Sequence, residues 1–219
     1  MNEKKNLTTE ETFVHAVKNH KKNNFQIAEN LYKEALKINP NHFESIYYLG
    51  VLLAQTKRFD LAKTLFHKAI QINPNYEDAH YNLGIALQKL GEHQKAISSF
   101  EKTIQLQSNH LDAHNNLGNV LKELGEHQKA ISSYEKAIQI NPNYVLPYNN
   151  LGKIFRELNE FNKSANYYEK ALKLDPNRKE TCGSYGNLLL KFNQHSKALS
   201  YIKKSTGFIS FTQKDFKII

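Results

Sequence analysis

Hydrophobic residues recur every three or four positions along most of the chain, in stretches separated by short polar breaks. This period places the apolar side chains on one face of an α-helix. The stretches end in two alternating ways. One kind ends on Asn-Pro or Asp-Pro in most units, and the other kind ends near Gly91, Gly125, Asn159 or Asn193. The residue before a proline resists the helical conformation, and Gly or Asn tolerates the left-handed one that closes a helix. We therefore expect pairs of amphipathic helices of roughly 12–14 residues, joined by tight turns.

These pairs follow a fixed period. Pro40, Pro74, Pro142 and Pro176 lie on one evenly spaced grid, and Ser108 occupies the missing position. We call the step from Pro40 to Pro74 the repeat period. Residues 90–106 and 124–140 are identical at 14 of 17 positions. Such a period is typical of repeat proteins, in which stacked units bury a common core. The grid predicts a short extension at 1–8, a repeat array at 9–206 and a non-repeat tail at 207–219. The expected units are 9–42, 43–76, 77–110, 111–144, 145–178 and 179–206.

Each unit resembles the tetratricopeptide repeat family. The first helix carries Leu-Gly, as in Leu83-Gly84, and the second carries Ala followed four residues later by an aromatic residue, as in Ala96 and Phe100. The Trp that the family has in its first helix is absent from every unit. The resemblance implies an all-α, right-handed superhelical solenoid of about six helix-turn-helix repeats. It also implies that one stripe of each first helix faces a concave groove.

That stripe contains Asn82, Asn116 and Asn150 at equivalent positions. A carboxamide donates and accepts hydrogen bonds at once, which suits an extended peptide backbone. The ladder is similar to that in the repeat region of O-GlcNAc transferase-like proteins. The alternative is that these amides only bridge adjacent helices. The candidate peptide-binding residues are the ladder Asn82, Asn116 and Asn150, the neighbouring Asn115, Asn119, Asn149 and Asp78, the aromatic Tyr47, Tyr48 and Tyr81, and the basic Lys122, Lys153 and Arg156.

Charge refines the expected partners. The net charge is +9, of which +7 falls in residues 170–219. Arg is scarce, and the basic residues are not interleaved with an aromatic stacking platform, so nucleic acid is disfavoured. We expect protein or peptide partners, including acidic segments that Lys122, Lys153 and Arg156 would meet. The chain shows no secretory signal, no membrane span and one cysteine, which favours the cytoplasm.

Catalytic patterns are missing from the sequence. His110 and His114 have the spacing of a helical metal pair but lack the HExxH context. His93, His127 and His195 share a position that other units fill with Phe, so we expect half-buried packing residues. Cys182 replaces a core aromatic residue, without a partner set for a nucleophile. We therefore expect no enzyme activity, no metal and no cofactor.

The tail GFISFTQKDFKII leaves the repeat pattern and ends on apolar residues. Three roles are open for it: it covers the last helix pair, it docks a partner or another copy of the chain, or it begins a further domain. Docking of another copy would give self-association through this end. The function expected is a non-catalytic protein-interaction scaffold that binds an extended peptide in the groove. The alternative is a substrate-recruiting arm of an O-GlcNAc transferase-like, sulfotransferase or oxygenase system whose catalytic domain is absent from this chain.

Overall fold

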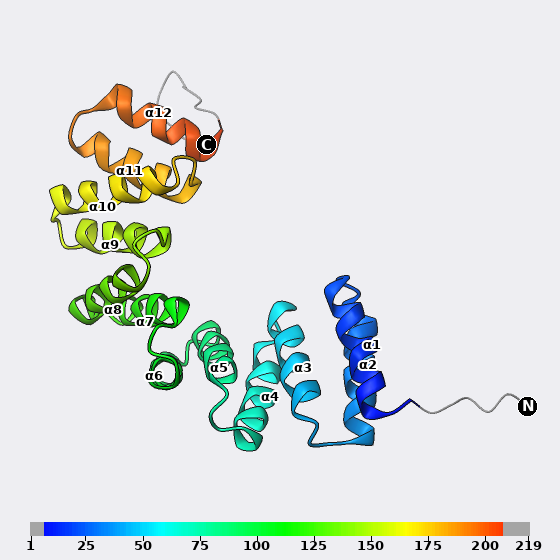
Figure 1. The fold of residues 1–219 in the computed structure, drawn as a ribbon. Coiled ribbons are helices and arrows are strands. Elements are labelled where there is room, and N and C mark those ends of the chain that lie inside the picture. The colour runs from blue at the N-terminus through cyan, green and yellow to red at the C-terminus, as the bar shows by residue number, and fades with distance from the viewer. Residues whose placement is uncertain (1–6, 208–219) are drawn as a thin grey trace, which may run out of the picture. The chain divides into compact units, whose positions relative to one another are not determined.

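The computed structural model describes residues 7–207, which form twelve α-helices and no strand (Figure 1). The predictions for the tail lie outside the described residues from position 208 onward, and so do residues 1–6 of the expected extension. The helices are α1 (Thr9–Lys21), α2 (Phe25–Ile38), α3 (Phe43–Gln55), α4 (Phe59–Ile72), α5 (Glu77–Lys89), α6 (His93–Leu106), α7 (Leu111–Glu123), α8 (His127–Ile140), α9 (Val145–Glu157), α10 (Phe161–Leu174), α11 (Lys179–Lys191) and α12 (His195–Thr206).

The turns between paired helices repeat one backbone conformation. Gly91 and Gly125 have φ values of 75° and 77°, and Asn159 and Asn193 have φ values of 60° and 58°, which confirms their predicted left-handed role. Lys57 occupies the equivalent position with a φ of 61°. A side chain with a Cβ is disfavoured in this conformation, so Lys57 is a strained member of the series.

Helices α2, α4, α8 and α10 end just before the Asn-Pro and Asp-Pro pairs, and α6 ends in the same way before Gln107-Ser108. Asn39, the residue after α2, is extended with φ −130° and ψ 98°, and Asp175, the residue after α10, has φ −137° and ψ 90°. Both precede a proline, whose ring excludes the helical conformation from its neighbour. The predicted stop signal is thereby confirmed.

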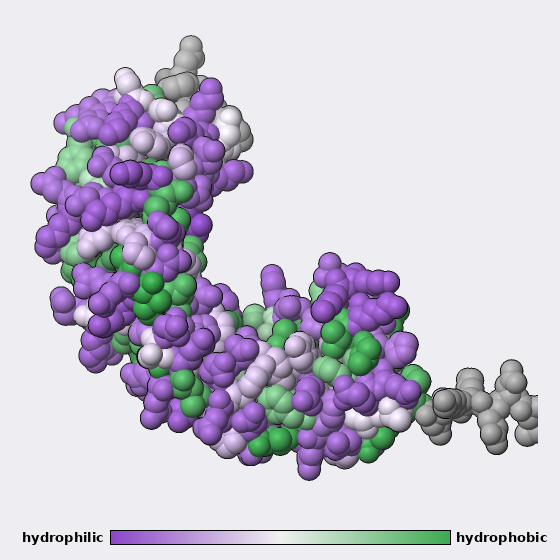
Figure 2. Space-filling view, viewed as in Figure 1, coloured by the Kyte–Doolittle hydropathy of each residue, from purple (hydrophilic) through white to green (hydrophobic). Residues whose placement is uncertain are grey.

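The chain divides into two compact units between Asn116 and Leu117, inside α7. In the first unit α1 contacts α2 and α3, and α3 contacts α4 and α5, so the first helices of successive pairs lie side by side. In the second unit α9 contacts α8, α10 and α11 in the same manner. Figure 2 shows hydrophilic side chains over much of the visible face of each unit, with hydrophobic ones among them.

In four of the described pairs a large ring is set against a glycine, and in the last pair Ile202 takes the place of the ring over Gly186. Phe100 of α6 is fully buried, and its ring lies directly over Gly84 of α5. Tyr168 of α10 is likewise buried over Gly152 of α9. The predicted alanines Ala28, Ala62, Ala96 and Ala130 are all fully buried. Small residues let the backbones approach, and the ring fills the remaining space between the two helices.

Two ion pairs link successive repeats in the first unit, with opposite polarity. The guanidinium of Arg58 donates two hydrogen bonds to the carboxylate of Glu29, at 3.1 and 2.7 Å. Lys63, at the position equivalent to Glu29, pairs at 2.7 Å with Glu92, at the position equivalent to Arg58. The acid and the base have exchanged places from one repeat to the next. Each pair lies where one second helix meets the turn of the following repeat.

Candidate functional site

The ladder asparagines join the first helix of one repeat to that of the preceding repeat. In the first unit, Nδ2 of Asn82 donates to the hydroxyl of Tyr47 at 2.9 Å, and Nδ2 of Asn116 donates to the hydroxyl of Tyr81 at 3.0 Å. In the second unit, Nδ2 of Asn150 donates to Oδ1 of Asn119 at 3.0 Å. These amides therefore bridge adjacent helices, and their role in peptide binding stays a prediction.

A bridging asparagine still has hydrogen-bonding capacity beyond the bridge. Asn82 is half-buried, and its Oδ1 accepts no hydrogen bond from the residues that the structure describes. The bond to Tyr47 also holds its carboxamide in one orientation. Oδ1 of Asn119 is used differently, because it accepts from both the Tyr134 hydroxyl at 2.8 Å and Asn150.

The three predicted tyrosines differ in exposure. Tyr47 is 7% exposed and packs edge-on against the ring of Tyr76, at 5.0 Å between centroids. Burial, reinforced by Asp78, raises the pKa of its hydroxyl well above the ordinary value. Tyr81 is half-buried, and burial with the nearby Asp112 raises its pKa to about 12. Tyr48 is 37% exposed, and its ring is therefore the one that a ligand would reach.

Two further candidates lie in the interior. Asn115 is 3% exposed and Asn149 is 1% exposed. Oδ1 of Asn149 accepts a hydrogen bond from the Thr181 hydroxyl at 3.0 Å, between α9 and α11. A ligand contact from Asn115, Asn149 or Tyr47 would require the helices to separate. We therefore leave these three side chains out of the proposed contact surface.

The basic candidates of the second unit already face carboxylates of the next repeat. Nζ of Lys122 lies 3.8 Å from the Glu157 carboxylate. Lys153 forms a short ion pair with Glu180, and this lysine holds the pKa of Glu180 below its usual value. Arg156 is half-buried and forms no ion pair with the described residues. The positive charge that could meet an acidic ligand here is therefore centred on Arg156.

The candidate metal histidines serve the backbone instead. Nδ1 of His110 accepts a hydrogen bond from the backbone N–H of Ala113 at 3.1 Å, close to the start of α7. Nε2 of His114 lies 3.0 Å from the carbonyl oxygen of Ser108. Within residues 7–207, no group of three or more His, Cys, Asp or Glu side chains could hold a metal ion.

The packing histidines divide into two cases. His93 and His127 are half-buried, as predicted. His195 is exposed, so the prediction is wrong there. It begins α12, the last helix that the structure describes, so it lacks the cover of a following described helix that His93 and His127 have.

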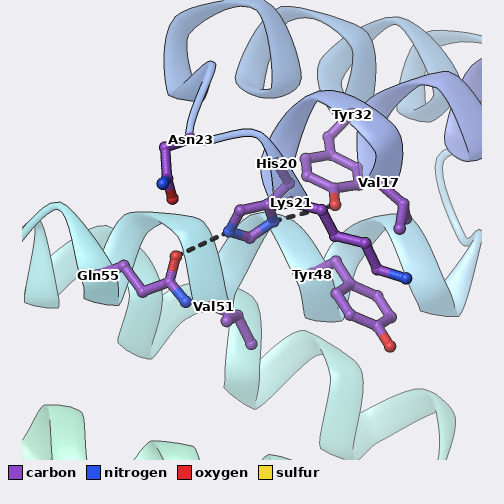
Figure 3. A pocket seen from close by; sticks show the side chains of 8 residues that line it. All are labelled: Val17, His20, Lys21, Asn23, Tyr32, Tyr48, Val51 and Gln55. Carbon is purple, nitrogen blue, oxygen red and sulfur yellow. Dashed lines mark hydrogen bonds between the residues drawn. The ribbon is translucent and has the colours of Figure 1, made fainter.

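Sequence reasoning missed a pocket in the first unit, between α1 and α3 (Figure 3). Its volume is about 300 Å³. The lining residues are Val17, His20 and Lys21 of α1, Asn23 of the turn, Tyr32 of α2, and Tyr48, Val51 and Gln55 of α3. A signal was present in the sequence, because Val17 and Val51 lie one repeat period apart on the stripe that contains Tyr48. The family resemblance predicts a role for the amides on this stripe and predicts none for these aliphatic residues.

The helix pairs define a class of protein. The first helices of the pairs begin at equal intervals of one repeat period, at Thr9, Phe43, Glu77, Leu111, Val145 and Lys179. The chain is therefore a helical-repeat protein. The family model described as tetratricopeptide repeat matches residues 76–143 and 109–177. A second model, described as anaphase-promoting complex, cyclosome, subunit 3, matches residues 21–103. The chain belongs to the tetratricopeptide repeat family.

Solved structures agree with this assignment. A crystal structure of MamA is 30% identical, with 74% of this chain and 94% of that chain covered and a TM-score of 0.70. PilF from Pseudomonas aeruginosa is 24% identical over 78% of both chains, with a TM-score of 0.70. YrrB, described as a TPR protein with an unusual peptide-binding site, is 18% identical over 80% of this chain and 91% of that one, with a TM-score of 0.61. The latter two show the fold alone.

Three negative findings complete the comparison. The search of curated proteins found no significant match. The specific likeness to the repeats of O-GlcNAc transferase-like proteins finds no support in the matches above. Among the described helices, none combines the length and apolar character needed to cross a membrane.

Proposed function

We propose that this chain is a non-catalytic interaction scaffold that holds an extended peptide segment against the first helices of its repeats. The observation that carries this proposal is the geometry of Asn82. Its Nδ2 is bonded to Tyr47 at 2.9 Å, while its Oδ1 takes no hydrogen bond from the described residues. An acceptor held in place before binding loses less entropy when a backbone N–H of a ligand reaches it.

Neighbouring side chains support the same function. The exposed ring of Tyr48 offers apolar contact area in the first unit. Asp78 and Tyr81 of the first unit are half-buried around Asn82 on α5. In the second unit, Arg156 supplies a charge for acidic segments of a ligand. The proposal places the chain in the cytoplasm, where its one free cysteine would stay reduced.

The alternative is a substrate-recruiting arm for a glycosyltransferase, sulfotransferase or oxygenase. The residues expected to dock such an enzyme, 207–219, lie outside the described residues from position 208 onward. No contact within 7–207 favours this function over a scaffold, and it stays a prediction.

A peptide-display selection on the immobilised full-length chain tests the proposal. Enriched peptides would be synthesised, and their affinity measured by fluorescence anisotropy for wild-type protein and for Asn82→Ala. Loss of one hydrogen bond to a fixed acceptor predicts an affinity about tenfold lower for the variant. Circular dichroism would first establish that both proteins have equal helicity.

Tyr47→Phe is the matched control, because it removes the same bridging hydrogen bond but leaves the Asn82 carboxamide present. We expect this variant to bind within about threefold of wild type, since it loses only preorganisation. Equal affinity of Asn82→Ala and wild type for every selected peptide would contradict the proposed role of the ladder. Equal losses in Asn82→Ala and Tyr47→Phe would show that the bridge is structural only.

A further inference from the structure

The pocket between α1 and α3, here called the first-repeat pocket, has an apolar wall that is open to solvent. Val17 of α1 and Val51 of α3 both line it, and Tyr48 lies between them in the view (Figure 3). Tyr48 is 37% exposed, and Val14, one turn before Val17, is 56% exposed. A volume of about 300 Å³ lies at the small end of ligand pockets. It suits one bulky side chain rather than a whole cofactor.

Three polar side chains at the base of the first-repeat pocket are linked by hydrogen bonds. His20 lies between Gln55 and Tyr32, with Nε2 2.8 Å from Oε1 of Gln55 and Nδ1 3.1 Å from the Tyr32 hydroxyl (Figure 3). Because Oε1 of Gln55 only accepts, Nε2 of His20 donates to it, and Nδ1 pairs with the Tyr32 hydroxyl. Both ring nitrogens of His20 are therefore occupied, and the exposed carboxamide of Gln55 supplies the remaining N–H donors at this end of the pocket.

Charge at the opening of the pocket is positive. Lys21 lines the pocket and forms no ion pair with the described residues. Lys18 and Lys22 are its neighbours at the end of α1. A carboxylate close to the apolar occupant would complement this charge. Since Lys21 is exposed, this attraction is expected to be modest.

The polar base of the first-repeat pocket is specific to the beginning of the array. The positions equivalent to Val17 and Val51 hold Ile85 in the third repeat and Asn119, Lys153 and Asn187 in the later ones, so the aliphatic character is kept for one more repeat and then lost. The position equivalent to His20 is Ala54 in the next repeat, so the base of linked polar groups is not reproduced there. This polar base therefore distinguishes the first repeat from the second, and the aliphatic residues distinguish it from the repeats after the third.

We propose that the first-repeat pocket receives one bulky aliphatic or aromatic side chain of a ligand peptide, and that a carboxylate adjacent to this side chain pairs with Lys21. The carboxylate comes from the end of a chain or from a neighbouring acidic residue. This proposal rests on the proposed peptide-binding function. It adds the kind of ligand side chain that the first-repeat pocket would accept.

The test uses small probes and methyl-labelled full-length protein observed by NMR. N-acetyl-leucine contains both the side chain and the carboxylate, N-acetyl-leucinamide lacks the carboxylate, and N-acetylglycine lacks the side chain. We expect saturable shifts of the Val17 and Val51 methyl resonances with N-acetyl-leucine and binding about threefold weaker for the amide. N-acetylglycine should leave these resonances in place. Binding of N-acetyl-Leu-Asp-amide as tight as that of N-acetyl-leucine would assign the carboxylate to a neighbouring acidic residue, and weaker binding would assign it to a chain end.

Three variants localise the effect. Val51→Asn introduces the residue found at equivalent position 119 and should abolish the shifts at Val17. Lys21→Gln should bring the acid and amide probes within about twofold of each other. Leu61→Asn makes a similar apolar-to-amide change at an exposed position of α4, away from the pocket, and should bind N-acetyl-leucine like wild type.

The outcomes separate this proposal from the proposed function. Absence of saturable shifts at Val17 and Val51 with N-acetyl-leucine would overturn the pocket, even if selected peptides still depend on Asn82. Equal binding of acid and amide probes to wild-type protein would overturn the role of Lys21. Probe binding that is lost in Val51→Asn supports the pocket, including the case in which Asn82→Ala has no effect on peptides.

Discussion

Gly84→Ala probes the close approach between α5 and α6. A Cβ on Gly84 would lie 2.7 Å from Cε1 and 2.8 Å from Cδ1 of the Phe100 ring. Carbon atoms rest at about 3.5–4.0 Å, so the ring would have to move by about 1 Å. Phe100 is fully buried, and the displaced ring would press on its neighbours. The cost of such overpacking is about 1–3 kcal/mol.

Helix propensity acts in the opposite direction. Ala is favoured over Gly inside a helix by about 1 kcal/mol. The two effects together predict that Gly84→Ala destabilises the α5–α6 pair by about 1 kcal/mol. In a Phe100→Leu background the smaller side chain relieves the contact, and the same substitution should then be neutral or stabilising by up to about 1 kcal/mol. The sign of the effect therefore depends on the residue at position 100.

Amide hydrogen exchange on α5 and α6 measures this effect, because repeat arrays do not always unfold in one step. The four proteins of the double-mutant cycle give the coupling between positions 84 and 100. Gly91→Ala is the control, since a Cβ there meets no atom within 4 Å and the cost comes only from its φ of 75°. It should show no coupling to Phe100. Stabilisation by Gly84→Ala in the presence of Phe100 would refute the reasoning.

Three other predictions concern the turns and ion pairs of the first unit. Lys57→Gly should stabilise the α3–α4 pair by about 0.5–1 kcal/mol, because glycine adopts the left-handed conformation without the steric strain of a Cβ. Unchanged protection of the α3 and α4 amides from hydrogen exchange would contradict this. Glu29→Lys and Arg58→Glu should each destabilise the unit, whereas the double variant recreates the polarity of Lys63 with Glu92 and should recover most of the loss in thermal denaturation. Lys63, followed by Lys95, lowers the pKa of Glu92 to about 2 from an ordinary 4.5. The unfolded chain then binds a proton that the folded chain does not, so this contribution is present above pH 4.5 and is lost as the pH falls toward 2. Glu92→Gln should flatten the melting temperature over that interval, and an unchanged slope would refute the assignment.

Local sequence signals predicted the helices well because their causes are local. Left-handed backbone at Gly91 and Asn159 follows from residue type, and so do the extended residues before Pro40 and Pro176. The strained Lys57 escaped notice as a left-handed residue, because a lysine carries no such signal by itself. Only the repeat period assigns it to the same position as Gly91.

The candidate site was predicted less completely, since exposure and pairing depend on other repeats. The sequence placed Tyr47 and Tyr48 on one stripe, but Tyr76 covers the first ring and leaves the second exposed. Lys153 was expected to meet a ligand, yet Glu180 of the next repeat reaches it first. A hydrophobic period does not show which neighbour a long side chain will find.

The sequence repeat by itself determined the family, the helix pairs and the register of the core. Small and large residues recur at equivalent positions of the units, one repeat period apart. The tertiary structure alone decided that the ladder amides bridge repeats, since the partner of Asn82 is the Tyr47 hydroxyl on another helix. It alone formed the first-repeat pocket, whose walls come from α1 and α3 and whose base includes Tyr32 of α2. Contacts between repeats depend on how closely the helices pack, and no single stretch of sequence contains that distance.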